Sequence, residues 1–234
     1  MTTLNRRIRA HIEQRILSGA WPPGHRIPFE HELMAEFGCA RMTVNKAIAA
    51  LVDAGLIVRR RRGGSFVAEP RVHAPVLAVP DIRAEVETRR RHYGLRLLTR
   101  QQRSPAKGSA IEEQLAGKGD LLALECLHLA DERPFALEER LISLDAAPAA
   151  VDADFSVIPP GTWLLDVVPW TEAEHRIAAI NADARIAGLL DIPPHTACLA
   201  VERRTWRGDV DVTHVRQIFP GSDYDLIARF TPKS

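Results

Sequence analysis

The chain has 234 residues, 46% of them hydrophobic and 26% charged, which predicts one large or two modest globular domains and excludes disordered and fibrous proteins. No apolar run approaches the roughly 18–20 residues of a membrane span, the first residues form no hydrophobic leader, and the three cysteines show no disulfide or zinc spacing. The formal net charge of +1 at pH 7, taken as a whole, argues against a nucleic-acid partner.

This net charge is an average over two unlike parts of the chain. Residues 1–72 contain 12 Lys and Arg against 6 Asp and Glu, a net charge of +6. Residues 73–234 contain 19 Lys and Arg against 24 Asp and Glu, a net charge of −5. A basic segment joined to an acidic one is typical of a protein in which only one domain contacts phosphates.

The basic part is predicted to form three helices followed by a hairpin. Apolar residues recur every four positions over 4–16 and predict a first helix. Apolar stripes over 33–37 and 44–51, each followed by a glycine, predict a short second helix and a third. Two short strands, 57–58 and 66–67, flank a basic turn. This order of elements predicts a winged helix-turn-helix.

Polar donors accompany the apolar stripe of the third helix. Arg41, Thr43, Asn45 and Lys46 lie off the stripe, near the helix start that enters the major groove in such motifs. Arginine can read guanine edges and asparagine adenine edges, and the basic turn at 59–62 would attract phosphates. Each residue alone would more often be a solvated charge, but the combination favours a DNA interface.

Four strings support this interpretation: GAWPPGHRIP at 19–28, EHEL at 30–33, RMTVNKA at 41–47 and GSFV at 64–67. In this order and spacing they resemble the winged-helix head of GntR-type bacterial transcription regulators, over residues 5–68. The resemblance implies binding to double-stranded operator DNA as a homodimer. It implies DNA contacts at Glu30, Arg41, Thr43, Asn45, Lys46, Arg62 and Gly64.

The chain departs from the family pattern at three positions. Phe29 and Ala40 stand where the family usually has serine before the second and third helices, and Arg62 replaces the first glycine of the wing. Each missing serine cap would cost about 1 kcal/mol if nothing replaced it. We expect DNA binding to survive these changes.

Proline-rich sequence separates the basic part from the rest. Prolines at 70, 75 and 80 predict a DNA-binding domain at 1–69, a linker at 70–80 and a second domain at 81–234. Just beyond the linker, Ile82 and Val86 suit a short helix that Tyr93 would extend.

The second domain is predicted to be an α+β body around an antiparallel sheet. Strand-like runs at 121–128 and 135–142 flank one turn, and runs at 197–206 and 210–219 flank another, which predicts two hairpins. Helical stretches are expected in between, and they are placed around 163–168 and 171–190.

Three strings in this body are the most diagnostic: PFALEER at 134–140, WTEAEHRI at 170–177 and ERRTW at 202–206. They resemble the effector-binding (UTRA) domain of the HutC subgroup of GntR regulators, which has a chorismate-lyase-like fold, over about residues 76–232. The resemblance implies a repressor of histidine utilization genes whose effector is urocanate, an intermediate of histidine breakdown.

A site for urocanate needs a hydrogen-bonding partner for an imidazole and a cation for a carboxylate. Glu138 and Arg140 alternate onto one face of a strand, and His128 comes from its partner strand. Glu138 is expected to accept the imidazole N–H, and Arg140 or Arg216 to hold the carboxylate. A structural Glu138–Arg140 ion pair is the competing interpretation. The resemblance implies ligand contacts at His128, Glu138, Thr162 or Trp163, Thr213 and Phe219, and with Arg140 and Arg216 these residues make up the expected set.

Other functions fit the sequence less well. Glu172 and His175 are one helical turn apart, but without a third ligand an amphipathic helix face is favoured over a metal site. A lyase-like enzyme would leave the basic head unexplained, and no catalytic set is defensible. A GntR-type regulator of a sugar phosphate or another organic acid stays an alternative. We expect no metal or other cofactor, no membrane partner, and a cytoplasmic protein that joins the nucleoid when it binds its operator.

Overall fold

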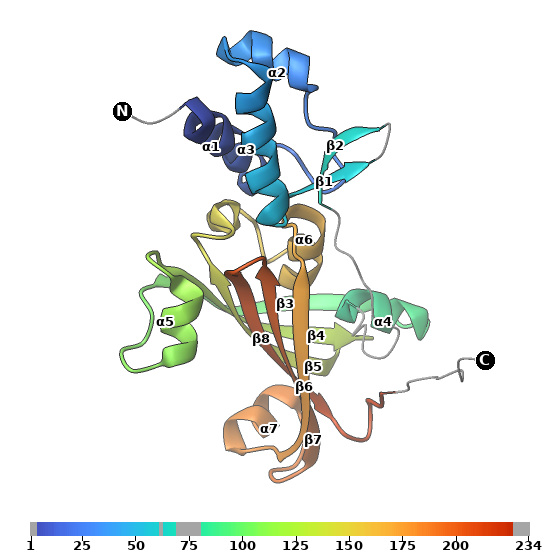
Figure 1. Ribbon diagram of the computed structural model, residues 1–234. Helices are drawn as coiled ribbons and strands as arrows, with labels where there is room; N and C mark the ends of the chain where they lie inside the picture. The colour runs from blue at the N-terminus through green and yellow to red at the C-terminus, as the bar shows by residue number, and fades with distance from the viewer. Residues whose placement is uncertain (1–3, 61–62, 69–80, 227–234) are drawn as a thin grey trace, which may run out of the picture.

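The computed structural model describes residues 4–60, 63–68 and 81–226. They form an N-terminal head, residues 4–68, and a larger body, residues 81–226, which lies beneath the head in Figure 1. The predicted linker at 70–80 and the wing residue Arg62 lie outside the described residues.

The head has the order of elements that the sequence predicts. The two strands pair antiparallel, so that Ile57 lies opposite Val67 and Arg60 opposite Gly64. The elements are α1 (Leu4–Leu17), α2 (Glu30–Phe37), α3 (Arg41–Asp53), β1 (Ile57–Arg60) and β2 (Gly64–Val67). The predicted winged helix-turn-helix is therefore confirmed.

The core of the head is formed by the apolar stripes that predicted its helices. Ile8, Ile12 and Ile16 of α1 are completely buried and pack with Val44 and Leu51 of α3. Complete burial of each such side chain stabilises the head by about 1.5–3 kcal/mol. Because these residues occupy one side of α3, its polar residues are left on the other side.

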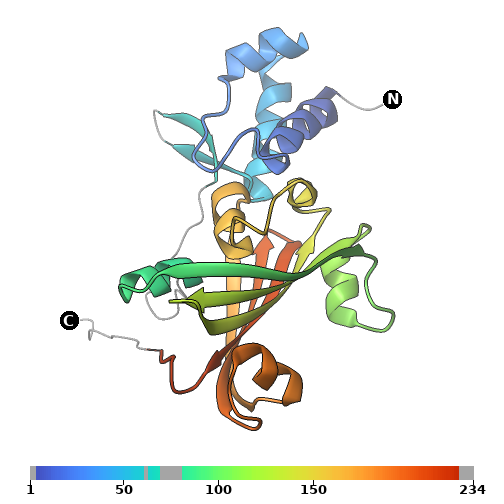
Figure 2. The same cartoon turned by 180° about the vertical axis from the view of Figure 1, so that it is seen from behind.

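The body is built on six antiparallel strands in the order β3-β4-β5-β8-β7-β6. Figure 2 shows this sheet from behind, with α6 on the side of the head. The strands are β3 (Tyr93–Arg103), β4 (Leu121–Ala130), β5 (Arg133–Ser143), β6 (Glu172–Asn181), β7 (Ala197–Arg207) and β8 (Val210–Pro220). The helices are α4 (Ile82–Thr88), α5 (Ala110–Ala116), the 3-10 helix η1 (Pro148–Val151), α6 (Pro160–Val167) and α7 (Ala184–Leu190).

Both predicted hairpins are present. The β4–β5 turn places Asp131 at φ 51° and Glu132 at φ 64°, and the β7–β8 turn places Gly208 at φ 57°. Left-handed residues at a two-residue turn match the twist of the flanking strands, which fixes the register of each hairpin.

The predicted helix at 171–190 is wrong over its first half. Residues 172–181 form the edge strand β6, and α7 begins only after Asp183, whose carboxylate accepts a hydrogen bond from Ile186 N at 2.7 Å. On a strand Glu172 and His175 point to opposite faces, so the expected amphipathic helix face is also wrong. No cluster of three metal-ligating side chains occurs among the described residues. The sequence also gave no prediction of β3 or α5, and Tyr93 begins β3 instead of extending α4.

The two faces of the sheet are covered by different helices. On one face, which we call the α7 face, Ile186 and Leu190 of α7 pack on Leu127, Leu137 and Ile218. On the opposite face, which we call the α6 face, the covering residues come from α4 and α6. Trp163 and Leu164 of α6 belong to an apolar cluster with Leu124 and Ile142, while Ile82 and Val86 of α4 belong to a second cluster with Ala136 and Phe219.

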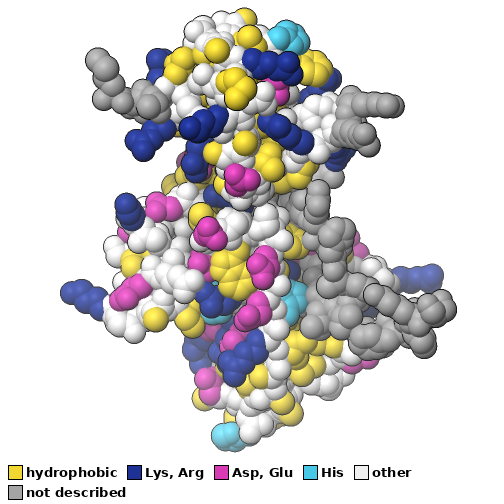
Figure 3. Space-filling view, in the orientation of Figure 1, with side chains coloured by type: hydrophobic (Ala, Val, Ile, Leu, Met, Phe, Trp, Pro, Cys, Tyr) yellow, Lys and Arg dark blue, Asp and Glu magenta, His cyan; other side chains and the backbone are white. Residues whose placement is uncertain are grey.

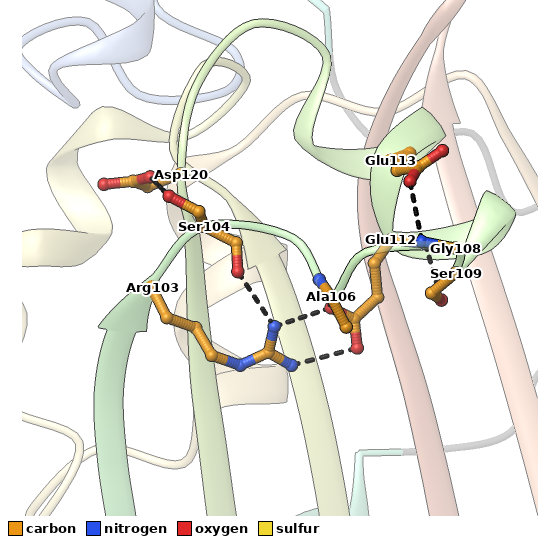
Figure 4. A network of polar contacts seen from close by, with 8 residues as sticks. All are labelled: Arg103, Ser104, Ala106, Gly108, Ser109, Glu112, Glu113 and Asp120. Atoms are coloured by element: carbon orange, nitrogen blue, oxygen red, sulfur yellow. Dashed lines mark hydrogen bonds and ion pairs between the residues drawn. The ribbon is translucent and has the colours of Figure 1, made fainter.

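A polar network fixes the segment between β3 and α5 (Figure 4). Arg103 donates two hydrogen bonds to the Glu112 carboxylate, at 2.6 and 2.9 Å, and Ala106 N donates a third at 2.8 Å. The hydrogen bond from Arg103 is the main reason that the pKa of Glu112 lies below its usual value. Bidentate pairs of this kind restrict geometry as well as adding energy, so α5 is held in place on the α7 face.

The head rests on the body through small residues. A Cβ atom added to Gly19, after α1, would lie 3.2 Å from Val167 at the end of α6. A Cβ atom added to Gly208 would lie 3.3 Å from the carbonyl oxygen of Ala54, which follows α3. In both views of the ribbon α6 lies between the head and the sheet (Figures 1 and 2). Helices long and apolar enough to cross a membrane do not occur in the part of the chain described.

Candidate DNA interface and effector-binding site

The outer side of α3 is open to solvent. Arg41 and Lys46 are exposed, Met42 is 78% exposed, and Thr43 and Asn45 are partly exposed. Lys and Arg side chains gather on the head in the space-filling view, whereas acidic side chains are concentrated on the body (Figure 3). The polar residues singled out from the sequence therefore lie together on an accessible, basic surface, which suits contact with a polyanion.

Two side-chain contacts join α3 to the neighbouring elements of this surface. Arg41 Nε donates to Glu30 Oε2 at 2.8 Å, which joins α3 to α2. Arg59 Nη2 donates to Asn45 Oδ1 at 2.9 Å, which joins the wing strand β1 to α3. Exposed contacts of this kind contribute at most about 1 kcal/mol, so bases and phosphates can compete for the same groups.

The helices α2 and α3 begin without the side-chain caps that serine provides in the family pattern. The backbone carbonyls of Phe29 and Ala40 accept hydrogen bonds from the first turn of each helix, but neither side chain caps its helix. At α2, the Glu32 carboxylate accepts from Phe29 N at 2.6 Å, which supplies one half of a capping box. The Phe29 ring in turn lies under Arg26, whose guanidinium carbon is 3.8 Å from the ring centroid.

These residues border a hollow in the head. It has a volume of about 520 Å³ and separates the start of α2 from the wing. Glu30 and Arg41 line it on one side and Gly64 on the other. The hollow therefore brings three of the predicted DNA contacts together, although they come from three different elements.

The body contains a buried polar cluster on the α6 face of its sheet. Its members lie on three neighbouring strands, β4, β5 and β8, and each is exposed by 5% or less. It separates the two apolar clusters that cover this face. We call it the polar cluster, and it comprises His128, Glu138, Arg140, Thr213 and Gln217.

Glu138 is the centre of the polar cluster. Its Oε1 accepts from Arg140 Nε at 2.7 Å, and its Oε2 accepts from Gln217 Nε2 at 2.7 Å and lies 3.4 Å from His128 Nε2. His128 Nδ1 is 2.8 Å from the Tyr93 hydroxyl, and Arg140 Nη1 donates to Thr213 Oγ1 at 3.4 Å. Glu138 and Arg140 thus form an ion pair, which is the structural interpretation that competes with a ligand role for these two residues.

The electrostatics of the polar cluster follow from this pairing. Burial by itself would raise the pKa of Glu138, but the positive charge of Arg140 and the contact with His128 hold that pKa well below 4.5. Burial and the nearby Glu138 carboxylate raise the pKa of the Tyr93 hydroxyl, which stays protonated. Glu138 is therefore an ionised acceptor enclosed by donors.

Two buried nitrogens of the polar cluster lack a hydrogen-bond partner among the described residues. They are His128 Nε2 and Arg140 Nη2. A buried polar atom without a partner costs about 1–3 kcal/mol, so these two nitrogens are candidates for contact with a ligand.

Residues of α4 and α6 close over the polar cluster. Thr162 Oγ1 donates to Asp81 Oδ2 at 2.5 Å, and a Cβ atom added to Gly161 would lie 3.4 Å from Arg140 Nη2. Trp163 and Phe219 flank the cluster from its two apolar sides. Trp163 meets the Phe155 ring edge-on at 5.6 Å and Phe219 stacks on Tyr224 at 4.0 Å between centroids.

The structure contradicts the expectation for Arg216. Thr213 and Arg216 are three positions apart on one regular strand, so they point to opposite faces. Arg216 lies on the α7 face, 3.5 Å from Glu139 and 3.8 Å from Glu202. It is therefore no candidate for the carboxylate clamp, whereas the other seven expected effector residues lie in or beside the polar cluster.

Four residues near the polar cluster were missed from the sequence: Tyr93, Asp81, Gln217 and Arg203. Gln217 has the same strand parity as Thr213 and Phe219, and this signal alone could have identified it. Asp81 and Tyr93 come from elements whose position over or beside the hairpins is a tertiary fact.

Comparison with known proteins agrees with this division into head and body. Residues 4–67 match the family model described as bacterial regulatory proteins, gntR family, and residues 88–225 match the UTRA domain. The histidine utilization repressor of Klebsiella aerogenes is 36% identical over 228 residues, which cover 96% of this chain and 93% of the relative. The protein of the same name from Pseudomonas aeruginosa is 35% identical and covers 96% and 90%.

Solved structures show the same fold. The C-terminal domain of the histidine utilization repressor from Pseudomonas syringae pv. tomato matches 60% of this chain and all of its own, with a TM-score of 0.55 and 31% identity. PhnF from Mycobacterium smegmatis matches 97% of this chain and all of its own, with a TM-score of 0.58 and 22% identity.

Proposed function

The chain belongs to the GntR family of bacterial regulatory proteins and carries a UTRA domain; it is a transcriptional repressor and not an enzyme. From this premise we propose that it represses histidine utilization genes and that urocanate releases it from its operator. Two lines support the proposal: the names of relatives that cover nearly the whole chain, and the chemistry of the polar cluster. The cluster is the observation that carries it.

Urocanate combines a flat imidazole with one carboxylate, and the polar cluster offers a group for each. Glu138 is ionised and would accept the imidazole N–H. His128 Nε2 lies 3.4 Å from Glu138 Oε2 and makes no hydrogen bond with a described residue, so it is a second polar atom available beside it. Arg140 Nη2 is the second unpartnered nitrogen and would donate to the carboxylate. The ligand would thus give a hydrogen-bond partner to the two nitrogens of the polar cluster that have none among the described residues.

The head supplies the DNA-binding half of the proposal. A homodimer would place two α3 helices in successive major grooves of a two-fold related operator. Arg41, Thr43 and Asn45 would contact base edges, and Lys46, Arg62 and Gly64 would contact the backbone. Glu30 would orient Arg41, which it already binds.

Release of the operator would proceed through α6. This helix borders Arg140 at Gly161, and its last residue, Val167, meets Gly19 of the head. Because the polar cluster is closed by α4 and α6, a bound ligand would favour a conformation in which α6 has moved. A ligand that binds this conformation better shifts the population away from the arrangement that holds DNA.

Fluorescence anisotropy with labelled operator DNA tests the proposal. The purified protein should bind DNA from the promoter of its own histidine utilization genes, and urocanate should weaken that binding at least tenfold. Glucose 6-phosphate is the control, since a sugar phosphate is the alternative effector. Release by the sugar phosphate with no effect of urocanate would overturn the proposal.

A further inference from the structure

We propose that Arg203 and Arg140 together form a site for a single carboxylate, which makes the UTRA domain of this chain selective for monoanionic effectors. The inference rests on the proposed function in that it concerns the same polar cluster, but it identifies a residue and a charge preference that the proposed function does not contain.

The sheet register places the two arginines in one row. Arg140 of β5 pairs with Val215 of β8, and Val215 pairs with Arg203 of β7. Residues directly opposite one another point to the same face, so both arginines project onto the α6 face. Neighbouring strands are about 4.8 Å apart, which puts the two backbones about 10 Å apart. The short side chain of Val215 between them leaves their guanidinium groups free to approach one another.

The guanidinium groups of Arg140 and Arg203 both have N–H donors that make no hydrogen bond with a described residue. Arg140 uses Nε for Glu138 and Nη1 for Thr213, whereas its buried Nη2 has no partner among the described residues. Arg203 forms no hydrogen bond or ion pair with another described residue. Burial, and next the positive charge of Arg140, lower the pKa of Arg203 to about 10, which agrees with two cations placed close together.

The charges around the cluster do not balance. Glu138 and Asp81 contribute two negative charges, and Arg140, Arg203 and Arg83 contribute three positive charges; Arg83 lies 5.2 Å from the centroid of the Tyr93 ring. Counted without His128, these described side chains have a net charge of +1. A buried charge without a counter-charge is unfavourable, so the site favours an anion. One carboxylate balances it, whereas a phosphomonoester, at about −1.5 to −2 near pH 7, overcompensates.

The neighbouring residue Arg204 provides a matched control. It points to the α7 face, where it lies 3.2 Å from Asp211 and its guanidinium carbon is 5.2 Å from the Trp206 centroid. The sequence alone does not show which of the adjacent residues Arg203 and Arg204 faces the polar cluster. In the structure one faces the polar cluster and the other does not.

Isothermal titration calorimetry on the full chain tests the inference, with urocanate and its uncharged methyl ester as probes. Arg203→Gln should weaken urocanate binding by about 10- to 100-fold, as expected for loss of a charge-assisted hydrogen bond. The ester should bind both proteins equally, and Arg204→Gln should bind urocanate like the wild type. Because Arg203→Gln removes an unbalanced charge, its melting temperature without ligand should equal or exceed that of the wild type.

Two outcomes separate the inference from the proposed function. If urocanate does not bind but cinnamate or another monocarboxylate does, and Arg203→Gln weakens that binding, the urocanate assignment fails and the carboxylate site stands. If a folded Arg203→Gln binds monocarboxylates as the wild type does, or if the wild type binds only glucose 6-phosphate or none of these probes, the inference is overturned.

Discussion

Gly55 at the end of α3 lies directly against Thr171 of the body, so closely that a Cβ atom at position 55 would overlap the Thr171 methyl group. Thr171 Oγ1 is itself fixed, because it accepts a hydrogen bond from Gly208 N at 2.8 Å. The recognition helix is therefore seated on the body through a glycine, and its orientation is tied to the domain that contains the polar cluster.

Replacement of Gly55 by alanine should loosen this contact. Gly55 has φ 68°, so alanine also introduces backbone strain of about 1 kcal/mol. Gly38→Ala is the matched control, because Gly38 has φ 57° and nothing within 4 Å of an added Cβ atom. Small-angle X-ray scattering should show a larger radius of gyration for Gly55→Ala than for Gly38→Ala.

A second substitution checks the cause of that change. Thr171→Ser removes the methyl group and keeps the hydroxyl that binds Gly208 N, so the double variant Gly55→Ala, Thr171→Ser should return to the wild-type radius. Equal radii for Gly55→Ala and Gly38→Ala would show that the contact does not hold the head.

Arg41→Ala should weaken operator binding by about 1–3 kcal/mol, the usual value of a good base contact, and should leave effector binding unchanged. Arg176→Ala is the charge-matched control, because its side chain is 76% exposed on the body. Fluorescence anisotropy measures the operator, and calorimetry measures the effector. If Arg41→Ala and Arg176→Ala bind the operator with equal affinity, α3 is not the recognition helix.

Glu138→Gln should abolish the response to urocanate while operator binding persists. It should also lower the free energy of unfolding by about 3–5 kcal/mol, because it leaves Arg140 buried without its counter-charge. Glu139→Gln is the matched control: it lies one residue on, faces Arg185 and Arg216 on the other side of the sheet, and should change stability by no more than about 1 kcal/mol. Urea denaturation measures both variants, and similar losses would contradict a special role of Glu138.

The stability of the folded protein should fall in acid, in part because the Glu138 carboxylate becomes protonated. Its pKa in the folded protein is well below 4.5, so the unfolded chain takes up the proton first. The contribution of this carboxylate is complete above pH 4.5 and is lost as the pH falls from there toward the pKa of the folded state. Denaturation curves between pH 7 and 3 should therefore fall less steeply for Glu138→Gln than for Glu139→Gln. Parallel curves would assign the acid sensitivity to other carboxylates.

Operator and urocanate should weaken each other's binding by the same factor. This equality follows from thermodynamic linkage and needs no assumption about the path between the sites. Calorimetry of urocanate with and without saturating operator DNA measures one side, and anisotropy measures the other. Equal urocanate affinity in both titrations would refute the coupling between head and body.

The sequence determined those features that depend on local patterns. The stripe Val44, Ala47, Ile48 and Leu51 predicted α3 and therefore which of its residues stay outside. The alternation of Glu138 and Arg140 predicted that both side chains share a face, because strand periodicity is local. The net charges of +6 over residues 1–72 and −5 over residues 73–234 likewise follow from the order of charges along the chain.

The tertiary structure decided everything that depends on which segments meet. Over residues 172–181 the alternation of charged and uncharged side chains is too weak to distinguish a strand from a helix. This segment is a strand because it pairs with β7. Periodicity within β8 separates Arg216 from Thr213, but only the register of β5, β8 and β7 brings Arg216 to Glu139 and places Arg203 in a row with Arg140. The physical reason is that side-chain periodicity is fixed within a strand, whereas its partners and the helices that cover it are set by long-range packing.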